Sequence, residues 1–199
     1  MKTKKIILVA LMAMTFISAS SQEKGKFRGG LDFGYVPTGG GGGVLFSIEP
    51  KFNLADNMNV GLRIGLAGIA RDIQDNNDQS STAKVAASTS YVGTYDYYFH
   101  KSGSSFAPFV GAGMGYYSLA NIEINDNAES ADINPSVTGV FGGLVRAGFE
   151  WGKFRMGVEY NLLPDSDLED IQGTKIGTVS NKYVGIHLGF YLGGGKWGK

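Results

Sequence analysis

The 199-residue chain has no cysteine, only two histidines and few charged side chains. Without cysteine it has no disulfide, no thiolate metal site and no lipid-modified N-terminal cysteine. Charged residues make up 18% of the chain, against about 25% in an average protein, which is little for a water-facing surface. The formal net charge is zero, and removal of three N-terminal lysines leaves a mild acidic excess. Nothing in this balance favours binding to nucleic acid.

Long hydrophobic runs are also missing beyond the first segment. There, three lysines precede an apolar run from Ile6 to Ile17 that is too short to span a bilayer as a helix. Ala19 and Ser21 supply the small side chains that a signal peptidase reads. We therefore expect residues 1–21 to be a signal peptide, cleaved near Ser21, and residues 22–199 to form one domain. An N-terminal anchor helix is the alternative.

What the chain does contain is period-two alternation of apolar residues with polar or small ones, which predicts β-strands. Many of these stretches reach the roughly 9–11 residues that a tilted membrane strand requires. If the domain lies in a membrane it must be a closed barrel, because lipid offers no partner to unpaired backbone groups. The eight stretches are 27–35, 44–52, 60–67, 88–99, 110–116, 141–151, 154–162 and 184–192.

Short and long connections alternate between these stretches. Short turns are expected at Leu54–Asn59, His100–Ser105 and Trp151–Lys153, and long polar loops at Arg71–Ala83, Leu119–Ser136 and Leu163–Gly177, with a glycine run at Thr38–Gly43. Short periplasmic turns that alternate with longer outer loops are typical of membrane barrels. The pattern predicts an all-β, eight-stranded antiparallel up-and-down transmembrane β-barrel.

Alternation alone does not say which face lies outside. A soluble, secreted lipocalin-like barrel that binds an apolar ligand has the same period, with its apolar face inward. Here, however, the polar face consists of Gly, Ala and Ser with occasional charges, rather than the Lys, Glu and Gln of a water-facing surface. We therefore expect the apolar rows to face lipid and the small residues to face a narrow lumen.

Three motifs carry a resemblance to a known family: Pro108-Phe-Val-Gly-Ala-Gly-Met-Gly-Tyr116, the hairpin EWGKFRMGVEY from Glu150 to Tyr160, and the closing Val184-Gly-Ile-His-Leu-Gly-Phe190. With them, the whole chain after the signal resembles the small eight-stranded outer-membrane barrels related to outer membrane proteins A and X, particularly the single-domain versions of Bacteroidetes-like bacteria. The resemblance implies a Gram-negative cell outer membrane location. Because the motifs consist largely of glycine and aromatic residues, they imply a fold rather than a function.

Ten charged residues fall on the rows expected to face the lumen. Five cations and five anions in a narrow, poorly hydrated space are expected to pair, because an isolated buried charge costs several kcal/mol. We predict a structural ion-pair network that closes the barrel, with a small gated pore as the alternative. The ten residues are Arg28, Asp32, Glu49, Lys51, Arg63, Asp96, Arg146, Glu150, Arg155 and Glu159.

Acidic residues also gather in the three long loops. Exposed loops need charge for solubility, and a sharper hypothesis is that divalent cations bridge this acidic rim to anionic surface glycolipid. A formal calcium loop is not expected at Asp165–Asp170, which lacks the required glycine and the bidentate glutamate. The loop acids are Asp72, Asp75, Asp78, Glu123, Asp126, Glu129, Asp132, Asp165, Asp167, Glu169 and Asp170.

Catalytic chemistry is not expected. His100 falls in a predicted turn and His187 points toward ion pairs, so neither stands with a serine and a carboxylate as lipid-modifying barrels require. The glycines from Gly111 to Gly115 lack the third glycine and the helix of a dinucleotide site. We expect no enzyme, no cofactor and no bound metal within the fold. The expected protein is a monomer in outer-membrane lipid, with both termini in the periplasm and a structural or surface-interaction role.

Overall fold

The computed structural model describes residues 22–38, 41–74, 81–100, 104–124, 136–169 and 175–195; within the strands, the side chains of 41, 70–74, 81–86, 121–124, 136–137, 166–169 and 175–179 are not described. The predicted signal peptide, residues 1–21, lies outside the described residues. No helix among the described residues is long and apolar enough to cross a membrane.

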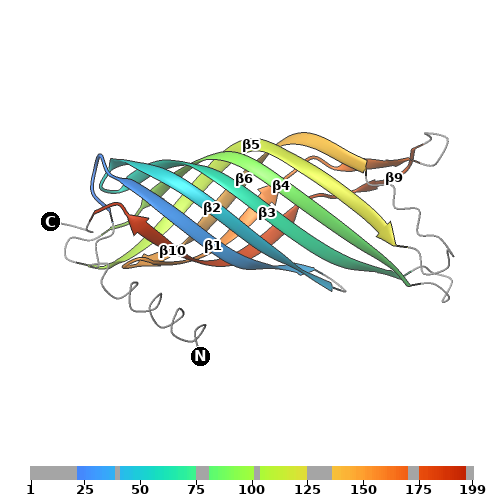
Figure 1. Cartoon of the computed structure of the whole chain (residues 1–199), viewed down its shortest axis with the longest axis horizontal. Coiled ribbons are helices and arrows are strands. Elements are labelled where there is room, and N and C mark those ends of the chain that lie inside the picture. The colour runs from blue at the N-terminus through green and yellow to red at the C-terminus, as the bar shows by residue number, and fades with distance from the viewer. Residues whose placement is uncertain are drawn as a thin grey trace, which may run out of the picture.

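Eight antiparallel strands form a closed barrel (Figure 1). In spatial order they are β1 (Phe27–Thr38), β10 (Tyr183–Gly193), β7 (Phe154–Leu162), β6 (Ser136–Trp151), β5 (Phe106–Ile124), β4 (Ser81–Tyr98), β3 (Met58–Gln74) and β2 (Gly41–Ala55). Each barrel strand pairs with the next barrel strand along the chain, β7 with β10 included, and β1 pairs with β10 to close the wall. The predicted eight-stranded up-and-down barrel is confirmed.

The apolar rows face outward on all eight barrel strands. On β1, Phe33 is 62% exposed while the adjacent Asp32 is 2% exposed, and exposure alternates in the same way along β7 and β10. Ile64, Val158 and Leu188 are likewise exposed. In a lipocalin-like barrel these side chains would fill the interior. The soluble alternative is therefore wrong, and the expected direction of the two faces is correct.

The two ends of the barrel differ. The described chain begins and ends at one of them, the terminal end, together with the turns Asp56–Asn57 and Gly152–Lys153 (Figure 1). The opposite end, the loop end, receives the connections after β1, β3, β5 and β7. Apolar surface covers the wall between the two ends, and an exposed apolar band of this extent marks a membrane-facing surface.

At the loop end the strands run further than expected. Both ends of the predicted loop Arg71–Ala83 continue the β3–β4 ladder, and the first residues of the predicted loop Leu119–Ser136 continue β5, which runs to Ile124. The predicted loop Leu163–Gly177 contains part of a separate two-stranded sheet, formed by β8 (Ser166–Glu169) and β9 (Lys175–Val179). The predicted bounds of these long loops were too wide, because backbone pairing does not require an apolar face: β-branched residues continue the pleat after the lipid-facing pattern has ended. The middle of each predicted loop falls outside the described residues.

Three prolines lie in the described barrel strands, Pro37 near the end of β1, Pro50 in β2 and Pro108 in β5. We expect such residues at strand ends or bulges. Pro108 is the third residue of β5, near the terminal end. Pro50 lies inside β2, where the β2–β3 ladder skips from Ile48 to Lys51 without a change of register. The wall therefore tolerates a local loss of hydrogen bonds at Pro50 without a bulge.

Candidate functional site

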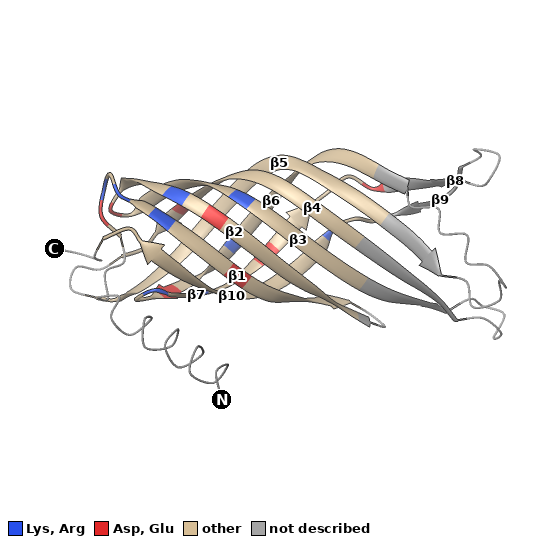
Figure 2. Ribbon diagram, in the orientation of Figure 1, with Lys and Arg blue, Asp and Glu red and all other residues tan. Residues whose placement is uncertain are grey.

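The lumen holds all ten of the charged residues singled out from the sequence. They come from β1, β2, β3, β4, β6 and β7, and each is at most 4% exposed. Figure 2 shows that charged residues of the strands gather in the half of the barrel nearer the terminal end. The inward positions carry them because every strand of a barrel turns alternate residues toward the axis.

Asp96 and Glu49 form the centre of this charged layer. Asp96 accepts hydrogen bonds from Arg146, whose Nε lies 2.8 Å from Oδ1, and it is also paired with Lys51 and Arg155. Glu49 accepts from Arg146 Nη2 at 2.7 Å and lies 3.3 Å from Lys51 Nζ. Two carboxylates therefore share three cations, so each charge at the centre has an opposite charge beside it.

Two further pairs flank the centre. Arg28 Nη2 lies 2.7 Å from Glu150, and Arg63 Nη2 lies 2.9 Å from Glu159. Arg155 Nη1 lies 3.8 Å from Glu150 and links the first pair to the centre. Nine of the ten residues thus lie in cation–carboxylate pairs.

Asp32 has a different partner. Its Oδ1 lies 3.4 Å from Nδ1 of His187, on the neighbouring strand β10. The sequence placed His187 in the lumen but did not include it among the paired residues. The contact follows from the β1–β10 register, in which Asp32 lies opposite Gly189 and Gly34 lies opposite His187, and the sequence of either strand alone does not record that register.

Aromatic hydroxyls complete the network, and sequence reasoning missed them. Tyr191 donates to Glu49 at 2.9 Å and accepts from Arg155 at 2.7 Å. Tyr98 donates to Glu150 at 2.7 Å. Both tyrosines share the inward parity of a polar lumen residue on the same strand: Tyr98 stands two residues after Asp96, and Tyr191 stands four residues after His187. That parity could have identified them.

The loop-end half of the lumen contains no such network among its described side chains; it is filled by an apolar layer. These side chains stand on the same inward rows as the charges, further along each strand, so an inward row changes from polar to apolar along its length. Sequence reasoning missed this change. The apolar layer consists of Val36, Leu45, Ala67, Ile69, Val92, Tyr117, Leu119, Leu144, Leu163 and Tyr183.

The mouth at the terminal end is covered by the segment that precedes β1. Gln22 is fully buried, and its Oε1 accepts a hydrogen bond from Arg28 Nη1 at 3.0 Å. Asn53 donates to the carbonyls of Glu23 and Gly194 at 2.9 and 3.1 Å. The first and last described segments are thereby joined across the mouth.

Lys153, in the turn between β6 and β7, is a basic group at this end whose pKa is shifted. Its ammonium donates to the carbonyl of Gly193. Partial burial, together with the positive charge of Arg28, lowers the pKa of Lys153 to about 8, although Glu150 opposes the shift.

Most of the acidic loop residues that the sequence singles out have no described side chain. Of the eleven loop acids, only Asp165 has a described side chain, and it lies 3.3 Å from Lys182. The hypothesis of cation binding at the rim falls on residues outside the described part. Within that part, no group of three or more His, Asp or Glu side chains is arranged to hold a metal ion.

Two solved structures are similar to this chain. The N-terminal β-barrel domain of Pseudomonas aeruginosa OprF is 16% identical over 86% of this chain and 100% of that chain, with a TM-score of 0.47. Neisserial surface protein A is 11% identical over 84% of this chain and 95% of its own, with a TM-score of 0.45. No protein-family model matches the chain, and no curated protein matches its sequence. The chain's own strand pairing defines its fold.

Proposed function

We propose that this protein is a non-catalytic barrel of the outer membrane whose lumen is closed, and that it acts structurally or through surface contacts made at its loop end. The outward apolar rows support membrane insertion, because on a water-soluble barrel they would expose a continuous apolar surface. The export signal expected at residues 1–21 agrees with this location.

The observation that carries the closed lumen is the change of chemistry along its axis. Near the terminal end the ion pairs around Asp96 cross the lumen from β4 to β2, β6 and β7, and toward the loop end buried side chains such as Leu144 and Tyr117 replace them. An ion that entered the first layer would then have to cross an apolar layer. That crossing is costly, because an ion without water or a counter-charge is strongly disfavoured in such surroundings.

Planar-bilayer recording of the purified, refolded protein tests the closed lumen. We expect no stable conductance above the bilayer background. A persistent open channel of ion-conducting size would overturn the proposal of a closed lumen and favour the small gated pore. Fractionation tests the location separately: we expect the protein in the detergent-extracted membrane fraction, with a heat-modifiable band on gels.

The non-catalytic role rests on the surroundings of the two histidines. His187 is buried beside Asp32, and His100 Nε2 lies 3.0 Å from the carbonyl of Ser104. The contact of His187 is with a buried carboxylate and that of His100 is with a backbone carbonyl, and neither of these contacts is that of a general base with a serine nucleophile. Incubation with radiolabelled phospholipid or lipid A is expected to release or transfer no acyl chain; turnover lost on replacing either histidine would contradict this role.

A further inference from the structure

The wall of the barrel is not sealed along its whole length. The β1–β10 ladder joins Arg28 to Gly193 at the terminal end and stops at Tyr35 and Ile186. Yet β1 continues to Thr38 and β10 begins at Tyr183, and both segments belong to the described chain. In an unbroken register Pro37 would lie opposite Val184, so the ladder ends while strand is still available on both sides.

Pro37 explains why pairing stops there. The amide of Gly194 donates to the carbonyl of Phe27 at 2.8 Å, so Phe27 directs its backbone groups toward β10. Backbone groups alternate in direction along a strand, and Pro37, ten residues further on, therefore also faces β10. The next hydrogen-bonded pair after Tyr35 and Ile186 would need an N–H from Pro37, which proline lacks.

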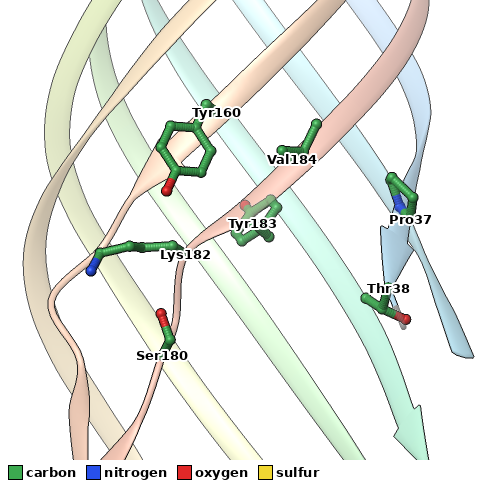
Figure 3. A pocket seen from close by; sticks show the side chains of 7 residues that line it. All are labelled: Pro37, Thr38, Tyr160, Ser180, Lys182, Tyr183 and Val184. Carbon is green, nitrogen blue, oxygen red and sulfur yellow. The ribbon is translucent and has the colours of Figure 1, made fainter. Parts of the chain in front are cut away.

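A pocket of about 570 Å³ lies at this interruption. Figure 3 shows Pro37 and Thr38 on one side of it, and Tyr160, Tyr183 and Val184 with the segment before β10 on the other. Val184 and Tyr160 belong to the outward rows, whereas Tyr183 is 7% exposed and packs in the apolar layer of the lumen. The pocket therefore leads from the lipid-facing wall toward the apolar interior.

The polar groups of the pocket come from the segment before β10 and from the end of β1. They are the hydroxyls of Ser180 and Thr38 and the ammonium of Lys182. Lys182 is paired with Asp165 at 3.3 Å, but both side chains are more than 40% exposed. Exposed pairs of this kind contribute little to stability, so the ammonium can exchange the carboxylate for another anion.

We propose that this pocket binds a membrane lipid sideways, with an acyl chain against Val184, Tyr160 and Tyr183 and an anionic phosphate headgroup at Lys182. Its volume is within the roughly 300–1,000 Å³ of small-molecule sites. Basic and tyrosine side chains are also the usual anchors at headgroup level. The inference rests on the proposed membrane location but not on the closed lumen.

Photo-labelling of the folded, full-length barrel in phosphatidylcholine nanodiscs tests the site. The probe is a lysophosphatidylglycerol with a diazirine on its acyl chain, and the reference probe is the corresponding monoacylglycerol, which lacks the phosphate. We expect the phosphate probe to label the peptides that contain Pro37 and Val184 about threefold more than the outward row of β3, an excess of the size that one exposed ion pair provides. Lys182→Gln is expected to reduce this excess to the level of the reference probe.

Two variants separate a site from general lipid contact. Val184→Trp fills the pocket from the lipid side and is expected to abolish the local excess, whereas Leu66→Trp enlarges an outward residue two strands away and is expected to leave it unchanged. Lys26→Gln, at the terminal end, is the control for charge. Heat-modifiable migration establishes that each variant is folded, and Val184→Phe replaces the tryptophan variant if that one does not fold.

The outcomes are distinct. The lipid site would be overturned by even labelling around the barrel, or by an excess that neither Lys182→Gln nor Val184→Trp reduces. Either result would still be consistent with the proposed membrane location. No labelling of any outward row would instead contradict the membrane location, and the lipid site with it.

Discussion

Asparagine at position 96 would remove one charge from the centre of the lumen with almost no change in side-chain size. Asp96 is fully buried and is paired with Lys51, Arg146 and Arg155. Asp96→Asn therefore leaves Lys51 and Arg146 with Glu49 as their carboxylate partner, and Arg155 with Glu150 at 3.8 Å. Loss of one partner of a buried pair costs about 3–5 kcal/mol, which corresponds to a rise of about 150- to 5,000-fold in the unfolding equilibrium constant.

Urea unfolding in lipid vesicles, followed by heat-modifiable migration and tryptophan fluorescence, measures this free energy. The matched control is Asp165→Asn, which breaks a half-exposed pair with Lys182 and is expected to cost less than about 1 kcal/mol. A second comparison combines Asp96→Asn with Lys51→Met, which removes one cation as well. We expect the double variant to be more stable than the two single losses predict, by about 0.5–3 kcal/mol of coupling energy.

The result that refutes the reasoning is equality of the two aspartate variants. If Asp96→Asn costs no more than Asp165→Asn, water reaches the centre of the lumen and screens its charges. The ion-pair network would then not exclude water from the lumen, whatever the distances between its atoms.

Three further changes probe other parts of the barrel. Leu144→Ala opens a cavity in the apolar layer and is expected to lower the free energy of unfolding in urea by about 2–5 kcal/mol. No conductance is expected in bilayer recordings of this variant, because the ion pairs still cross the lumen. Pro37→Ala supplies the missing N–H, so hydrogen exchange at the amide of Val184 is expected to slow and photo-labelling of the pocket to fall. Pro50→Ala is the control and is expected to change neither. Unchanged exchange at Val184 in Pro37→Ala would contradict the account of the interrupted ladder. The pKa of Lys153 is lowered to about 8, against 10.5 for a free lysine. Between these pH values the unfolded state binds more protons than the folded state, so the free energy of unfolding is expected to rise from pH 8 to 10.5. Lys153→Met is expected to flatten that rise.

The fold and its direction were predictable because a membrane barrel imposes one rule on every strand. Alternate residues meet lipid or lumen, so the apolar row of each stretch fixes both the strand and its outward face. Asp32 and Phe33 illustrate this: their opposite exposure follows from adjacent positions in one stretch. The number of strands then follows from counting stretches, and the short turns from the gaps between them.

Contents of the lumen were less predictable, because pairing across it depends on shear. Which inward residues share a level is set by the stagger between strands, and no sequence pattern within one strand records it. His187 rather than a cation lies beside Asp32 for this reason. The apolar layer was not predictable for another reason: Leu45 and Val92 each have small or polar neighbours of the same parity, so neither stretch shows by itself where the inward row becomes apolar.

Closing the axis and opening the wall depend on different physics in this barrel. Along the axis, a solute must displace ion pairs such as Arg146 with Asp96 and then part the apolar layer around Leu144. At the wall, a single absent donor at Pro37 already interrupts the ladder and leaves a pocket beside Val184. The first route requires breaking many contacts, whereas the second displaces only the exposed pair of Lys182 and Asp165. Exchange with the surroundings is therefore expected through the wall. On the two proposals together, the barrel binds molecules from the membrane and conducts nothing across it.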